Sequence, residues 1–91
     1  MTRDTRIEVS PSVYARAFGE EIVLLDFGRG EYFGLDAIGA AVWRGIEAGQ
    51  SLGDISDAIA SQYEVQSEDA YRDIIDLVRH LQDESLVRVA C

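Results

Sequence analysis

Residues 21–36 read EIVLLDFGRGEYFGLD, and this short stretch sets the architecture of the chain. The run Glu21–Asp26 is rich in branched apolar residues and predicts a central strand. Gly28 and Gly30 follow it and supply the backbone freedom that a tight hairpin loop requires. The next run, Glu31–Leu35, should therefore fold back antiparallel on the central strand and form an edge of the sheet.

The segments on either side of this hairpin extend the pattern. Upstream, Val13–Phe18 has the composition of a first strand, with residues 19–20 as its turn. Downstream, Asp36 is placed to cap a helix that spans about residues 37–48. Gly49 then stands where a left-handed residue would end that helix.

Two more helices are expected in the second half of the chain. Ser51, with Asp54 three residues later, resembles a capping box for a helix that ends near Glu64. Ser67 is the expected cap of a third helix, and residues 86–89 either add a short closing strand or pack as a tail. Three strands followed by three helices predict an α+β fold with one three-stranded antiparallel sheet, and the last two helices also fit a winged helix-turn-helix.

The third predicted helix has a wide apolar stripe. At about 100° per residue, its apolar residues cover roughly half of the circumference. They are Ala70, Tyr71, Ile74, Ile75, Leu77, Val78 and Leu81. The polar remainder consists of Arg72, Asp73, Asp76, Arg79, His80 and Asp83. This stripe is wider than one core contact needs, so part of it is free to form one wall of a groove.

Size and composition narrow the class of protein. The 91 residues have room for one domain, which we assign to residues 13–91 with residues 1–12 as an N-terminal extension. No apolar run approaches the roughly 20 residues of a membrane span, and no signal segment is evident, so we expect a cytoplasmic protein. The net charge is −9, with 17 acidic side chains against 8 basic ones, which argues against nucleic acid as a partner.

The sequence offers little for catalysis. His80 and Cys91 are the only candidates for a thiol and imidazole pair, and a solvated histidine with an incidental terminal thiol explains them better. One histidine and one cysteine cannot complete a zinc site. We therefore expect no enzyme activity, no metal and no cofactor.

Two groups of side chains allow more than one interpretation. Arg72 and Arg79 stand on nearly the same side of the third helix, where they either pair with Asp76 or hold an acidic ligand. Three aromatic residues, Tyr32, Phe33 and Tyr71, either belong to the core or line a site. An extended peptide could add to the edge strand Glu31–Leu35, because such an edge carries unpaired backbone groups.

Two sequence motifs carry a resemblance to a known family. The hairpin has a Gly-x-Gly-x-Tyr-Phe-x-Leu-Asp progression over residues 28–36, and a Gly-Ala-x-x-Trp helix follows over residues 39–43. Together they resemble the PqqD-like family, also described as RiPP recognition elements, and in particular the stand-alone leader-binding proteins of lasso-peptide biosynthesis. The similarity runs from about Val13 to Val89.

The resemblance implies a winged helix-turn-helix that binds the leader of a ribosomally made precursor peptide. The leader would pair antiparallel with the third strand and lie against the third helix. By position, the strand wall would consist of Tyr32, Phe33, Gly34 and Leu35, and the helix wall of Tyr71, Ile74, Ile75 and Val78 with Arg72 and Arg79 at the rim. The implied partners are the precursor peptide, a cysteine-protease-like leader peptidase and an ATP-dependent macrolactam synthetase.

Two other functions compete with this one. A winged-helix DNA-binding regulator has a compatible helix order and size, but the third helix offers only Arg72, Arg79 and Gln82 to bases among five acidic residues. A dimerisation module could pair two copies of the chain through the exposed edge strand.

Overall fold

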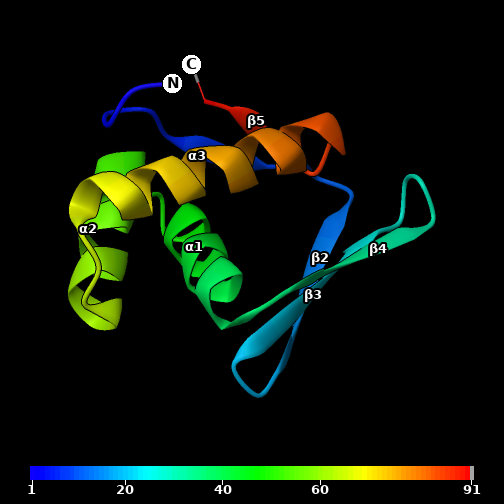
Figure 1. The fold of residues 1–91 in the computed structure, drawn as a ribbon. Coiled ribbons are helices and arrows are strands. Elements are labelled where there is room, and N and C mark those ends of the chain that lie inside the picture. Colours follow the sequence, from blue (N-terminus) through cyan, green and yellow to red (C-terminus); the bar gives the residue numbers. More distant parts are fainter. Residues whose placement is uncertain (91) are drawn as a thin grey trace.

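The computed structural model describes residues 1–90 and folds them into three helices and five strands. In chain order these are β1 (Ile7–Val9), β2 (Val13–Phe18), β3 (Glu21–Asp26), β4 (Glu31–Leu35), α1 (Ala37–Glu47), α2 (Leu52–Tyr63), α3 (Ser67–Asp83) and β5 (Val87–Val89). Figure 1 shows the helices gathered on one side, with the sheet of β2, β3 and β4 extending away from them. The predicted α+β class with three helices is confirmed.

The antiparallel meander of β2, β3 and β4 has the predicted bounds. β3 is central, with Val13 opposite Asp26 on one side and Ile22 opposite Leu35 on the other. Gly30 has the positive φ of 69° that its hairpin loop requires, and its N–H donates to the Asp26 carbonyl at 2.8 Å. The predicted edge position of β4 is confirmed.

The caps of the first two helices also follow the prediction. The Asp36 carboxylate accepts from the backbone N–H of Gly39 at 2.8 Å, and Gly49 adopts a φ of 77° after α1. The Ser51 hydroxyl accepts from the Asp54 N–H at 3.2 Å, and α2 stops before Glu64, which is left-handed. Sequence and structure agree here because caps depend on local chemistry.

The start of α3 differs from the prediction by one residue. Gln66 occupies the cap position without a side-chain hydrogen bond, and Ser67 is the first helical residue. The Ser67 hydroxyl instead donates to the Asp57 carboxylate of α2 at 3.0 Å. The prediction that Ser67 caps the helix is therefore wrong, because a charged acceptor on the neighbouring helix binds its hydroxyl.

A second sheet corrects the prediction of a single one. β5 pairs antiparallel with β1, with Ile7 opposite Val89, so the C-terminal residues form a strand rather than a tail. Strand β1 was not predicted, because three residues are too few for a periodic signal. Its partner β5 lies about 80 residues away in the chain.

The segment assigned as an N-terminal extension packs on the helices. Ile7 is buried in the core, and Arg6 adds an isolated bridge to Ser51. The carbonyls of Arg3 and Thr5 accept from backbone N–H groups at the start of α2, at 2.8 and 2.9 Å. These contacts fix most of residues 1–12 in place, whereas the boundary at residue 13 itself stays a prediction.

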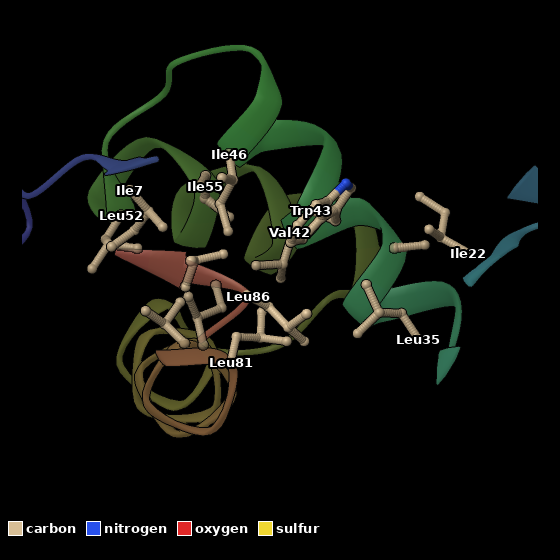
Figure 2. Close-up of a cluster of buried hydrophobic side chains, with 14 of the residues drawn as sticks. Ile7, Ile22, Leu35, Val42, Trp43, Ile46, Leu52, Ile55, Leu81 and Leu86 are labelled. Carbon is tan, nitrogen blue, oxygen red and sulfur yellow. The ribbon is translucent and has the colours of Figure 1, made fainter. Parts of the chain in front are cut away.

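The core lies between the helices and the inner faces of the two sheets. Figure 2 shows side chains from both sheets and all three helices meeting there, with Trp43 and Val42 near the centre. Leu24, Leu52 and Leu81 are fully buried beside them. At typical transfer values each such side chain contributes about 1.5–3 kcal/mol. α3 is therefore held firmly along one side, which fixes its position relative to β4.

Candidate functional site

The free edge of β4 is the first component of the site. β4 pairs with β3 on one side only, so alternate backbone N–H and C=O groups point away from the sheet. Along β4, Phe33 and Leu35 face the helices, and Leu35 is buried there. Tyr32 and Gly34 face the opposite side and are exposed. The predicted strand wall thus divides between two faces of the sheet.

The second component is the flank of α3 that faces β4. The rings of Phe33 and His80 lie 5.1 Å apart between centroids, tilted by 48°. Leu77 and Asp73 lie on the same side of the helix as His80, one and two turns back along it. We call Asp73, Leu77 and His80 the groove flank.

Two small hollows lie at the ends of the groove flank. The helix hollow, about 100 Å³, is enclosed by α1, α2 and α3 and is lined by Ile38, Val42, Ile59, Tyr63, Val65, Ala70, Asp73, Ile74 and Leu77. The hairpin hollow, about 120 Å³, lies where β4 approaches the end of α3 and is lined by Glu31, Tyr32, Phe33, Glu84 and Leu86. Arg29 closes its rim by donating to the Glu84 carbonyl at 2.8 Å. We refer to the β4 edge, the groove flank and these two hollows together as the β4–α3 groove.

Most residues of the predicted helix wall lie elsewhere, although Ile74 lines the helix hollow. Ile74 and Val78 are buried in the core. Tyr71, Arg72, Ile75 and Arg79, which we call the arginine flank, line another hollow of about 440 Å³ together with Arg3, Glu68 and Asp76. Because successive residues are about 100° apart, Ile75 and Leu77 point to nearly opposite sides of α3. In this structure the strand wall and the arginine flank do not share one groove.

The two arginines of this flank have different surroundings. Arg72 pairs with Asp69 at 3.7 Å rather than with the predicted Asp76. Within residues 1–90, Arg79 forms no ion pair. The interpretation of both arginines as partners of Asp76 is therefore wrong for the described part of the chain.

Arg3 joins the arginine flank from the N-terminal segment. Its guanidinium lies 5.9 Å from the centre of the Tyr71 ring and 2.8 Å from the Asp57 carboxylate. The hydrogen bond from Arg3 lowers the pKa of Asp57, and the hydrogen bond from the Ser67 hydroxyl lowers it further. Arg3 thus has a carboxylate partner, as Arg72 has in Asp69, so Arg79 is the cation of this hollow that has no ion pair within residues 1–90.

The β4 edge offers main-chain hydrogen-bonding groups, and the helix hollow offers mostly apolar side chains. Among residues 1–90 no three His, Cys, Asp or Glu side chains gather where they could hold a metal ion. Cys91, the predicted incidental thiol, lies outside the described residues. The solvent side of α3 is acidic, with Glu68, Asp69 and Asp76 exposed, which is unfavourable for a helix that reads DNA. In the same part of the chain, no helix has the length and hydropathy of a membrane span.

Comparisons with known proteins agree with this description. The family model of coenzyme PQQ synthesis protein D (PqqD) matches residues 21–87. Among solved structures, TbiB1 in complex with the TbiA(beta) leader peptide is 36% identical, with a TM-score of 0.86 over 89% of this chain and 94% of that one. A lasso peptide synthetase B1 complexed with the leader peptide is 30% identical, with a TM-score of 0.85 over 91% and 98%. No curated protein matches the chain.

Proposed function

The chain belongs to the PqqD family, and from this premise we propose that it binds the leader of a ribosomally made precursor peptide in the β4–α3 groove. One observation carries the proposal: the free edge of β4 lies beside the groove flank of α3, with a hollow at each end. Strand addition draws affinity from main-chain hydrogen bonds and specificity from pockets for alternate side chains. Both similar solved structures are leader complexes, which supports the same ligand class here.

In the proposed complex the leader runs antiparallel to β4. Its N-terminal part lies near Leu35 and the helix hollow, and its C-terminal part lies near the hairpin hollow. β4 spans five residues, so the paired segment covers about 17 Å at roughly 3.3 Å per residue. The helix hollow has mostly apolar walls, so we propose that it receives an apolar side chain of the leader.

Within this proposal the predicted site residues have different roles. Phe33 forms the floor of the groove together with His80 and Leu77, and the β4 backbone at Tyr32 and Gly34 lies next to the leader. The buried residues Leu35, Ile74 and Val78 support the groove from the core. Contacts of the leader with Tyr71, Arg72, Ile75 and Arg79 stay a prediction, and the groove geometry favours a leader that leaves them free.

The chain acts without catalysis in this proposal. It presents the leader to a cysteine-protease-like leader peptidase and an ATP-dependent macrolactam synthetase, and we place this activity in the cytoplasm. We also propose the finer description of the fold as a winged helix-turn-helix, since α3 follows α2 after residues 64–66 only. Precursor incubated with the chain alone should stay intact, and cleavage by the purified chain would contradict the proposal.

Amide hydrogen exchange tests the binding mode directly. The leader of a cognate precursor peptide is titrated into the isotope-labelled chain, and exchange rates are compared for the two edge strands. Alternate amides of β4 should slow at least tenfold, because those facing the free edge gain acceptors. The β2 edge is the matched control and should keep its rates, as should β4 with a scrambled leader.

Two results would contradict strand addition to β4. Protection of the β2 amides instead of the β4 amides would show that the peptide pairs with β2, the other edge of the sheet. Absence of saturable binding by the leader, together with a gel shift of duplex DNA at low salt, would favour the regulator interpretation. N-methylation of successive leader amides gives an independent check, since affinity should fall at every second position within the paired segment.

A further inference from the structure

Basic side chains are concentrated at one place on this acidic chain. Three of its eight basic residues, Arg3, Arg72 and Arg79, line the hollow of about 440 Å³ beside the arginine flank, which we call the arginine hollow. The chain as a whole has a net charge of −9. Arg79 is exposed and forms no ion pair within residues 1–90. The arginine hollow therefore presents a cation that the described chain leaves without a carboxylate.

The floor of the arginine hollow is apolar and held in place. Tyr71 is half-buried, and Ile75, one turn further along α3, is 9% exposed. The Arg3 guanidinium covers the Tyr71 ring at 5.9 Å from its centre and is itself fixed by the Asp57 carboxylate at 2.8 Å. A wall that is fixed before binding loses less conformational entropy when a partner arrives.

The charges along the open side of the arginine hollow alternate in sign. Glu68, Arg72, Asp76 and Arg79 lie near one another in a row along α3 and are all exposed. Arg72 and Arg79 are seven residues apart, which places them about 10.5 Å apart along the axis at roughly 1.5 Å per residue. An evenly negative polymer such as nucleic acid is repelled by the two carboxylates between and beside them. The row fits a protein segment that carries two carboxylates with an apolar side chain between them.

We propose that the arginine hollow docks an acidic segment of the macrolactam synthetase. Carboxylates of that segment bind Arg72 and Arg79. An apolar side chain of the same segment packs on Tyr71 and Ile75. The inference rests on the proposed function and adds a second surface to it. Charge complementarity favours this occupant, because charge-assisted contacts around an apolar floor give a protein interface both specificity and affinity.

The position of the hollow indicates which enzyme uses it. Ile75 and Leu77 point to nearly opposite sides of α3, so the arginine hollow stays open while a leader occupies the β4–α3 groove. In the proposed complex the C-terminal part of the leader lies near the hairpin hollow, and the peptidase must reach the bond that follows the leader. The synthetase acts on the core peptide beyond that bond, so it docks away from the hairpin hollow and leaves the peptidase free access.

The test uses the full chain with its cognate precursor, peptidase and macrolactam synthetase, each purified. Arg79→Glu should weaken binding of the synthetase to the chain about tenfold, measured by thermophoresis without precursor. Combining it with Arg72→Glu should weaken binding further, to about thirtyfold. The rate of ring closure at limiting synthetase should fall with the affinity. Leader affinity should stay within threefold of wild type, and the rate of leader cleavage within twofold.

Arg44→Glu provides the matched control. Arg44 is exposed on α1, outside the arginine hollow, and its replacement changes the net charge as much as Arg79→Glu does. Synthetase binding and ring closure should both stay within twofold of wild type. A loss as large as that of Arg79→Glu would mean that overall charge, and not the hollow, governs the interaction, and would overturn the assigned site.

Photo-crosslinking locates the contact independently. The crosslinker benzoylphenylalanine replaces Tyr71 on the floor of the hollow, or Gln62 on the exposed surface of α2 as the control position. Irradiation with purified synthetase should give a crosslink from position 71 only. The crosslinked synthetase segment should contain carboxylates on both sides of an apolar residue. A crosslink from position 62 alone would contradict docking at the arginine hollow.

Other outcomes separate this inference from the proposed function. Normal synthetase binding and ring closure by the double arginine variant would overturn the docking surface and leave leader binding intact. Loss of cleavage with normal ring closure would overturn the synthetase as the partner and assign the hollow to the peptidase. Failure of the wild-type chain to bind leader would contradict the proposed function itself. Light scattering addresses a second copy: a wild-type dimer that the double variant converts to monomer would replace the synthetase as the occupant.

Discussion

The two flanks of α3 border the same buried stripe but have different surroundings. Each combines apolar and charged residues just beside the buried stripe, yet the groove flank faces β4 and the arginine flank faces the N-terminal segment. His80 contacts Phe33 of the edge strand, whereas Tyr71 lies under Arg3. In the proposed binding mode, tertiary packing and not side-chain type decides which flank meets the leader.

The strongest test of this comparison is Ile75→Ser on the arginine flank. Ile75 is 9% exposed, so its replacement removes buried apolar volume and should lower the free energy of unfolding by about 3 kcal/mol. Urea unfolding measures this change, with Ile75→Val as the conservative control at about 1 kcal/mol. Leader affinity of the folded protein should stay within twofold. A stable variant with weak leader binding would show that Ile75 contacts the leader.

On the opposite flank, Leu77→Glu should weaken leader binding about a hundredfold. Leu77 lines the helix hollow beside Asp73, so a second carboxylate there makes the hollow polar and increases its negative charge. A hundredfold loss corresponds to about 2.7 kcal/mol. The matched control, Arg79→Glu, adds negative charge to the arginine flank and should change the affinity less than threefold. Equal losses in the two variants would mean that the flanks do not differ in function.

Phe33→Ala should have an intermediate effect, because it removes the contact between β4 and α3. Leader affinity should fall about tenfold, or 1.4 kcal/mol, as the floor of the groove is lost. The ring pair with His80 contributes about 0.5–1.5 kcal/mol to stability. A double-mutant cycle with His80→Ala measures that coupling by thermal unfolding. Coupling near zero would show that the two rings do not join the strand to the helix.

The smallest effect is expected for Arg72→Gln combined with Arg79→Gln. Exposed ion pairs contribute little, so stability should change by at most a few tenths of a kcal/mol for each arginine. Leader affinity at low salt should stay within twofold of wild type, because both residues belong to the arginine flank. A tenfold loss that disappears at high salt would instead show that acidic leader residues reach this flank.

Local signals in the sequence predicted most of the fold. The meander and its turns were predictable because Gly30 and the branched residues of β3 act over short distances. The caps at Asp36 and Ser51 were predictable for the same reason. The short strand β1 was not, since its pairing with β5 depends on residues at the other end of the chain. Ser67 was misassigned because its acceptor, Asp57, lies on another helix.

The site was predictable in part. The edge position of β4 could be predicted from the order of the strands alone, without knowledge of side-chain positions. The wide stripe of α3 was also visible, but a helical wheel shows only the angles between residues. It cannot tell which border of the stripe will face β4, so the sequence did not point to Leu77 and His80, and a contact of Arg72 with the leader stays a prediction. In the structure, Phe33 and His80 mark the border of the stripe that lies next to β4.

The pairing of β1 with β5 also bears on how the molecule folds. The backbone N–H of Ala90 donates to the Arg6 carbonyl at 2.9 Å, which closes a loop of nearly the whole chain. The entropy cost of closing a loop rises with its length. The β1–β5 pair should therefore form late in folding and open first in unfolding. A circular permutant could join the ends near residues 6 and 90 and place its new termini in the β2–β3 turn. In that permutant β1 and β5 would form a local hairpin. Its β1 and β5 amides should then be better protected from exchange than in the parent chain.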